Sequence, residues 1–524
     1  MPTQPHLFRD RYDQCDWIFD LFAHGFDFLN GRFFPPKLEA LDADWEREDE
    51  EVRKRNLVEL IMRADGDIPI ELRRYLRIPG DDAELETPEF CLRLYAALSA
   101  IDRAVADLNY FAAFARPLPP GRWERATEHV EQKRRQLQRF APGYIVFQPR
   151  DFETAGKTWH ARTLASGRWR EISTRGVNLS DFFKNLLRME EGNDCAVDIR
   201  LVSPAQDIEM DPPELRVGIV PLVDTLKANA TDALLVPGPL RLVKETVSPP
   251  AFGIRVDPPK DPARPCEELC ERADAALRYL AERGAQIVLF PEMVVPDPVL
   301  ARLREVLYDL TDSGKKRPAL ILAGTFSRIS KDHPSATPFN VAVALNDRGE
   351  ELWRQRKLQP YEMKRYEQQR FGLEQILDSD SCREHMAFVP RLLQFVDSRR
   401  TGWRMVTLIC EDATRAPGLS AARALRANLV LAPVMAGPLT HECGFAVNLD
   451  PIVNDYDAVF VVANSGSLAR AAWEDTKNPP PLGILGVPLV LSSKPYKTHK
   501  LLQEATPVPG ITGLEVLYYQ LPEA

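Results

Sequence analysis

The sequence predicts a C-terminal α/β domain preceded by a mainly α-helical N-terminal domain. The chain has 524 residues, more than a single hydrophobic core usually holds. Up to about residue 210, apolar residues recur mostly at helical spacing, whereas short apolar strands alternate with helical segments after it. We therefore expect two domains, residues 1–210 and residues 211–524.

The composition is that of a globular protein, with 44% hydrophobic and 27% charged residues, and this excludes a collagen or a coiled-coil rod. The 67 Lys and Arg against 76 Asp and Glu give a net charge of −9, which argues against nucleic acid as the main partner. The chain shows no apolar run of membrane-spanning length and no secretory signal, and its eight cysteines are scattered. We expect reduced thiols, a cytoplasmic location and no membrane contact.

The N-terminal region shows its clearest helix after Thr87, an N-cap residue that is followed by proline. Apolar residues then follow one helical face as far as Leu108. The aromatic-rich residues 13–29 predict another buried helix, and residues 121–135 predict a solvated helix of mixed charge. We find no catalytic motif in residues 1–210, and binding of a protein partner is one role that we consider for them.

The C-terminal region begins after a proline-bearing joint at residues 209–214. We expect strands near 215–220, 286–290, 319–323, 403–409, 428–432 and 458–462, a helix over 266–283 that ends at Gly284, and a hairpin whose strands 339–345 and 350–356 flank a turn at 346–349. The proline-rich segment 221–265 is too long for a loop between a strand and a helix, and the sequence pattern does not assign it to any element of the domain.

Three polar residues stand directly after apolar runs, where side chains leave a sheet. Glu292 follows residues 287–291, Lys357 follows the second hairpin strand, and Cys410 follows residues 406–409. Taken singly, each has an ordinary structural explanation as a capping, solvated or buried residue. Their order and their contexts together indicate a catalytic site.

With these motifs the sequence resembles the nitrilase superfamily, the carbon–nitrogen hydrolases with a Glu–Lys–Cys catalytic set. The resemblance covers about residues 215–491 and includes Pro291-Glu-Met293, Arg356-Lys357, Ile409-Cys-Glu-Asp412 and Ala463-Asn-Ser465. It implies a four-layer α-β-β-α sandwich and a homo-oligomer, at least a dimer. The residues around 378–400 depart from the family pattern and look like an insertion.

The resemblance implies a role for each of these residues. Cys410 is the expected nucleophile and Glu292 the general base, while Lys357 and the backbone N–H of Glu411 stabilise the oxyanion. The resemblance also implies a second glutamate, for which Glu362 is favoured over Glu367. It further implies substrate-binding residues, which are Asn464, Val434 and Met435.

The expected function is hydrolysis of a non-peptide C–N bond in a small molecule, an amide in preference to a nitrile, through a cysteine thioester. This chemistry needs no metal and no organic cofactor, and Cys266 and Cys270 lack the second ligand pair of a zinc site. Two alternatives stay open. One is a cysteine–histidine acyl hydrolase or acyltransferase that pairs Cys410 with His385 or His441. The other is a catalytically silent ligand-binding or regulatory module.

Overall fold

The protein was analysed as a computed structural model, which divides into two compact units. One comprises Met1–Arg150 and Arg162–Gly192, and the other comprises Asp151–Ala161 and Asn193–Ala524. The residues that the structure describes are 5–15, 18–29, 51–53, 55–63, 67–104, 145–147, 152–154, 157–159, 186–188, 196–201, 215–223, 240–245, 247–256, 266–327, 339–386, 392–398, 403–415, 418–425, 427–441, 443–456, 458–473, 478–486, 499–502 and 504–520. The expected joint at 209–214 and the charged segment 121–135 lie outside these residues.

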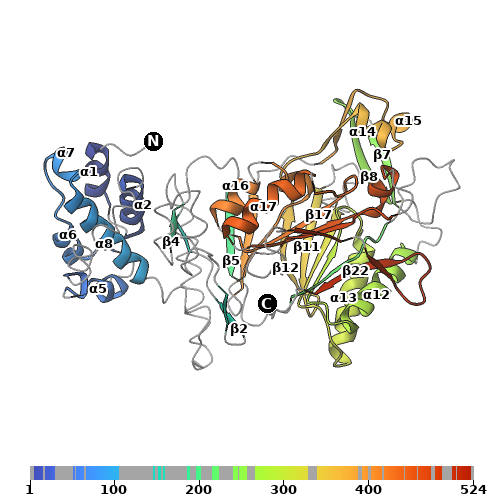
Figure 1. The fold of residues 1–524 in the computed structure, drawn as a ribbon, viewed down its shortest axis with the longest axis horizontal. Coiled ribbons are helices and arrows are strands. Elements are labelled where there is room, and N and C mark those ends of the chain that lie inside the picture. Colours follow the sequence, from blue (N-terminus) through green and yellow to red (C-terminus); the bar gives the residue numbers. More distant parts are fainter. Residues whose placement is uncertain are drawn as a thin grey trace, which may run out of the picture. The chain divides into compact units, whose positions relative to one another are not determined.

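The first unit is helical over its described N-terminal part (Figure 1). Its helices are α1 (Pro5–Asp13), α2 (Ile18–Leu29), α5 (Leu57–Arg63), α6 (Ile70–Leu76), α7 (Asp82–Leu85) and α8 (Pro88–Ala104). The expected cap is present, since Thr87 Oγ1 accepts a hydrogen bond from Phe90 N at 3.3 Å. Leu94, Leu98 and Ile101 of α8 are fully buried, as their helical spacing predicts.

The helix expected over the aromatic-rich residues 13–29 is present as α2, which begins five residues later, at Ile18. Helix α1 precedes it and ends at Asp13. Both contribute to one core, in which the rings of Phe8 and Phe28 lie 4.6 Å apart. The strands β1 (Ile145–Phe147) and β4 (Leu186–Arg188) also belong to this unit and form an antiparallel pair.

The second unit contains two seven-stranded sheets. The first has the order β12-β11-β10-β9-β6-β22-β21, with β12 (Glu351–Arg356), β11 (Phe339–Asn346), β10 (Leu320–Ser327), β9 (Ile287–Phe290), β6 (Arg216–Ile219), β22 (Glu515–Gln520) and β21 (Ala505–Pro507). The second has the order β20-β19-β18-β17-β16-β15-β5, with β20 (His499–Leu502), β19 (Gly483–Gly486), β18 (Val459–Asn464), β17 (Leu429–Val434), β16 (Arg404–Thr407), β15 (Leu392–Asp397) and β5 (Ala196–Leu201). The expected apolar strands are therefore present, with β5, β15 and β19–β22 in addition.

The predicted hairpin is present, since β11 and β12 pair antiparallel. Gly349 closes its turn at φ 77°, and its N–H donates to Asn346 O at 3.0 Å. Trp353 of β12 reaches the second sheet, where its Nε1–H donates to Thr407 Oγ1 at 3.1 Å. Gln355 Nε2 of β12 likewise donates to Leu392 O of β15, in the second sheet, at 3.0 Å. These hydrogen bonds link the first sheet to the second near the hairpin.

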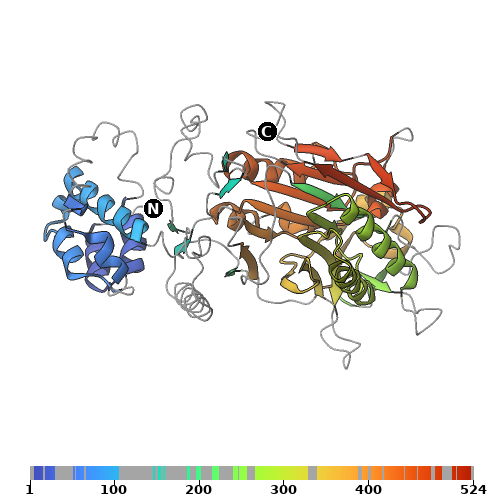
Figure 2. The same ribbon diagram turned by 90° about the horizontal axis from the view of Figure 1, so that it is seen from below.

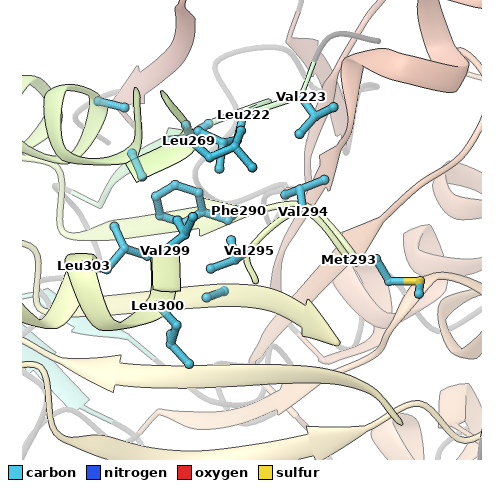
Figure 3. Packing of buried hydrophobic residues seen from close by; sticks show 14 of the residues in the cluster. Leu222, Val223, Leu269, Phe290, Met293, Val294, Val295, Val299, Leu300 and Leu303 are labelled. Carbon is cyan, nitrogen blue, oxygen red and sulfur yellow. The ribbon is translucent and has the colours of Figure 1, made fainter. Parts of the chain in front are cut away.

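Helices α12 (Glu267–Glu282) and α13 (Asp297–Asp312) lie side by side and pack on the first sheet (Figures 1 and 2). Gly218 of β6 allows α12 to lie close to the first sheet, because a Cβ atom there would lie 2.7 Å from a methyl carbon of Leu280 in α12. The side chains of Phe290, Met293 and Val299 all belong to this core (Figure 3). The core thus continues through the residues that directly follow β9.

Strand β5 corrects the expected domain boundary at residue 210. The sequence placed Ala196–Leu201 in the N-terminal domain, but this strand pairs in parallel with β15 along its whole length and lies in the second unit. Pairing with β15 satisfies the backbone groups on one side of β5, which is an edge strand of the second sheet. The strand pattern in the sequence does not identify this partner.

A third sheet explains part of the segment that the sequence could not place. Its order is β13-β14-β8-β7, with β13 (Glu362–Lys364), β14 (Ser381–Glu384), β8 (Ala251–Val256) and β7 (Leu240–Glu245). Residues 221–265 therefore supply a hairpin, β7–β8, and residues 378–400 supply β14 and β15. Among the helices in the described part of the chain, none is long and apolar enough to cross a membrane.

Candidate active site

Glu292 lies in a tight turn directly after β9. Met293 next to it has φ 57°, and the N–H groups of Val294 and Val295 both donate to Gly324 O, at 3.1 and 3.0 Å. A Cβ atom at Gly324 would lie 2.1 Å from Pro291 O and 2.6 Å from Glu292 Cα. Only glycine on β10 leaves room for this turn, and the turn directs Glu292 to a buried position with 2% exposure.

Lys357 follows β12, and its ammonium group binds two carboxylates. Its backbone N–H donates to Asn340 O at 2.9 Å, which extends the β11–β12 pairing by one residue. Its Nζ donates to Glu292 Oε1 at 2.8 Å and to Glu384 Oε2 at 2.6 Å. All three side chains are at least 95% buried, so these ion pairs are shielded from water and salt.

Glu384, at the end of β14, is the site residue that the sequence analysis missed. Besides the ammonium group, its Oε2 accepts the backbone N–H of Tyr361 at 3.1 Å, and its Oε1 accepts Asn340 Nδ2 at 2.6 Å. The one feature that marks Glu384 is the alternation of buried and exposed residues along β14. Cys382 and Glu384 are buried, and Arg383 between them is exposed.

Asn340 of β11 bridges the two carboxylates. Its Nδ2 donates to Glu292 Oε1 at 2.6 Å and to Glu384 Oε1 at 2.6 Å. Like charges close together repel, and the shared amide group together with the Lys357 ammonium compensates for that repulsion. Four side chains from separate segments thus form one buried network.

Cys410 begins the 3-10 helix η6 (Cys410–Ala413) and has φ 49°, in the left-handed region that non-glycine residues seldom adopt. The backbone N–H of Met435 donates to Glu292 Oε2 at 2.9 Å, and the same N–H lowers the pKa of the Cys410 thiol. The charges of Glu292 and Lys357 also act on this pKa, so the thiol lies near the carboxylate and the ammonium group.

The electrostatics favour a protonated thiol at rest. Burial raises the pKa of Cys410 well above its ordinary value, the charge of Glu292 raises it further, and Lys357 opposes the shift. Burial also raises the pKa of Glu292. Burial alone would lower the pKa of Lys357, but the carboxylates Glu292 and Glu384 outweigh it and raise this pKa well above its usual value. The site therefore pairs a neutral thiol with a carboxylate made more basic by burial.

The two residues after Cys410 differ in what they contact. Glu411 follows Cys410 in the first turn of η6, and its side chain pairs with Arg415. Asp412 is 1% exposed and accepts the N–H groups of Leu358 at 2.9 Å and Gln359 at 3.0 Å. Asp412 thus ties the turn that carries Cys410 to the backbone that follows Lys357.

The glutamates expected as second carboxylate lie elsewhere. Glu362 is exposed on β13, where it pairs with Lys364 at 2.6 Å and accepts a hydrogen bond from Ser381. Glu367 accepts the hydroxyl hydrogen of Tyr361 at 2.5 Å. Glu384 therefore occupies the place beside Lys357 for which the sequence favoured Glu362. The reason is the added sheet, which brings a residue from a later strand to the ammonium group.

The residues expected to bind substrate are placed around the loop after β17. Val434 is fully buried, and Met435 contributes the N–H described above. Asn464 accepts Ala436 N at 2.9 Å and donates to Ala436 O at 3.2 Å and Gly437 O at 2.9 Å. Its side chain thereby fixes the loop that presents Met435 to Glu292 and Cys410.

The two histidines of the alternative mechanism stand apart from these contacts. The backbone N–H of His385 donates to Phe252 O at 2.7 Å, and His441 is exposed. The groups that act most strongly on the pKa of Cys410 are Glu292, Lys357, Glu384 and the Met435 N–H, rather than a histidine. Within the described residues, no cluster of three or more His, Cys, Asp or Glu side chains is arranged to hold a metal ion.

The described site defines a class: a buried thiol with an adjacent carboxylate, an ammonium group and a second carboxylate. No model of a known protein family and no curated protein matches the chain. Among solved structures it is similar to an amidase from Nesterenkonia sp., at 16% identity and a TM-score of 0.32, over 59% of this chain and 90% of that one.

Two further solved structures come from Nesterenkonia sp. AN1. One is a cysteine-to-alanine variant of an amidase described as a member of the nitrilase superfamily, with 16% identity, a TM-score of 0.33 and coverage of 59% and 91%. The other is the corresponding variant in complex with butyramide, with 15% identity, a TM-score of 0.33 and coverage of 61% and 93%. All three of these solved structures are of amidases.

Proposed function

We propose that this chain hydrolyses a non-peptide carbon–nitrogen bond, in an amide rather than a nitrile, through a thioester on Cys410. The observation that carries the proposal is the buried Glu292 carboxylate, which accepts the Met435 N–H at 2.9 Å and pairs with Lys357 at 2.8 Å, beside a thiol whose pKa these groups shift. This carboxylate is a suitable proton acceptor for the thiol.

In the first step, Glu292 takes the thiol proton while the sulfur attacks the amide carbon. The S–C bond forms and the carbonyl oxygen becomes an oxyanion, which the Lys357 ammonium and the Glu411 N–H stabilise. The C–N bond then breaks, and Glu292 gives its proton to the leaving amine or ammonia. A thioester is left on Cys410.

In the second half, Glu292 takes a proton from water as the water attacks the thioester carbon. The tetrahedral intermediate collapses, the carboxylic acid leaves, and the proton returns to the sulfur. Glu384 and Asn340 touch no reacting atom in this scheme. They hold Lys357 and Glu292 in place, so they act as positioning residues.

Turnover of a panel of short aliphatic amides and nitriles tests the proposal. Cys410→Ala and Glu292→Gln are expected to abolish turnover, because the first removes the nucleophile and the second the proton acceptor. His385→Ala and His441→Ala are expected to keep it. Loss of turnover in a histidine variant with retention in Glu292→Gln would instead support the cysteine–histidine mechanism.

The same proposal includes the wider assembly. The contacts of α12 and α13 with the first sheet, and of α17 (Gly444–Tyr456) with β18 and β19 of the second, support an α-β-β-α order of layers. Homo-oligomerisation and a protein partner for the N-terminal unit stay predictions, which light scattering after size-exclusion chromatography and cross-linking would test.

A further inference from the structure

The β7–β8 hairpin is a described part of the second unit that the mechanism does not use. In the third sheet, β8 is the direct neighbour of β14, the strand that ends at Glu384. We propose that this hairpin is a positioning element for Glu384 and thereby sets the catalytic competence of Lys357. The inference rests on the proposed hydrolase function.

The backbone around Glu384 is held from both sides. Arg383 N donates to Pro250 O at 3.0 Å and His385 N donates to Phe252 O at 2.7 Å, so both neighbours of Glu384 are bound to the β8 side. On the other side, Glu384 N donates to Tyr361 O at 2.8 Å. These bonds fix the direction in which the Glu384 side chain leaves the strand.

Side-chain packing also holds β14 in place. In the parallel register Glu384 lies opposite Phe252, which is 7% exposed and belongs to the same core as Cys382 of β14. Paired residues of parallel strands project to the same face of the sheet, so the Phe252 side chain lies next to Glu384 on that face. Ile254 lies two residues further along β8, is 4% exposed, and pairs with Leu242 rather than with β14.

This arrangement supplies a matched pair of variants. Phe252→Ala removes packing opposite Glu384, whereas Ile254→Ala removes comparable packing from the same face of β8 beyond the β14 register. The readout is the pH dependence of Cys410 alkylation by iodoacetamide, followed on the Cys410 peptide by mass spectrometry. Glu292, Lys357 and Glu384 are the charged side chains that act on this thiol.

The expected results are specific to positioning. Glu384→Gln removes a negative charge, so the alkylation profile should move to lower pH. Phe252→Ala should move it in the same direction and lower turnover on the order of tenfold, because small misplacements of catalytic groups are costly. Adding Phe252→Ala to Glu384→Gln should change neither quantity further, since both act through one group. Ile254→Ala should leave the profile in place.

Three results would overturn the inference: an unchanged profile in Phe252→Ala, full additivity in the double variant, or an equal shift in Ile254→Ala. If Phe252→Ala does not fold, Phe252→Leu is subject to the same comparisons. Failure of the hydrolase proposal is separately visible. If Glu384→Gln retains full turnover while Cys410→Ala loses it, the hairpin inference falls alone; if Cys410→Ala retains turnover, the proposed function falls.

Discussion

Glu384 Oε2 lies 2.6 Å from Nζ of Lys357, an ammonium group that also binds Glu292 Oε1 at 2.8 Å. Two buried carboxylates thus share one buried cation, and Asn340 bridges them. Removing one partner from such a network leaves the remaining charges without compensation, which is costly in a buried site.

Glu384→Gln should lower kcat by about tenfold to a hundredfold, because the neutral amide no longer holds the ammonium group in place. Glu362→Gln is the matched control, since Glu362 is exposed on the neighbouring strand and pairs with Lys364. We expect it to stay within about twofold of the wild type. Steady-state kinetics on one amide compares them, and a larger loss in Glu362→Gln would contradict our assignment.

Asn340→Ala should lower both kcat and the free energy of unfolding, the latter by about 1–3 kcal/mol, since two buried carboxylates lose a donor. Asn346→Ala on the same strand is the control. Its side chain caps the hairpin turn through Arg348 N and Glu350 N, and lies away from the site. Urea unfolding and kinetics together should show a loss of stability in both variants and a loss of kcat in Asn340→Ala alone.

Gly324→Ala should destabilise the turn that carries Glu292, because its Cβ atom would lie 2.1 Å from Pro291 O. Relieving such a contact moves backbone, and we expect a cost of about 1–3 kcal/mol together with a loss of kcat. At Gly444 the nearest atom to a new Cβ is 3.5 Å away. Gly444→Ala should therefore change the unfolding midpoint little, and equal effects at the two glycines would refute the steric argument.

Stability should depend on pH through Asp412. Burial raises the pKa of Asp412 to about 8, against about 4 in an unfolded chain. Between these values the folded protein binds one proton more than the unfolded one, so this group makes stability fall as pH rises from about 4 to about 8. Asp412→Asn cannot titrate, and its unfolding free energy should lose this slope in urea titrations at pH 5, 6, 7 and 8. An unchanged slope would show that Asp412 is not the group responsible.

Much of the second unit could be predicted because its signals are local. The buried strands β9 and β17 are continuous apolar runs, and a polar residue directly after a strand marks the point where side chains leave the sheet. Glu292, Lys357 and Cys410 could be read from such ends, since each lies within a few residues of the strand that positions it.

Glu384 could not be predicted in this way. Its strand is short and polar, and its partners Ala251 and Phe252 come from a distant hairpin. Glu362 stood closer to Lys357 in the sequence, but the register of β13 leaves it exposed. The same limit applies to β5, whose partner β15 is remote in sequence. Pairing between distant strands depends on tertiary packing, which a local pattern does not encode.

The most direct test of the account is the capture of an acyl-enzyme on Cys410. Rapid acid quench during turnover of an amide, followed by intact and peptide mass spectrometry, should show one acyl group on Cys410 that hydroxylamine removes, as expected for a thioester. Glu292→Gln should show no such adduct above background. Turnover without an acyl group on Cys410, or with the acyl group on another residue, would contradict the proposed mechanism.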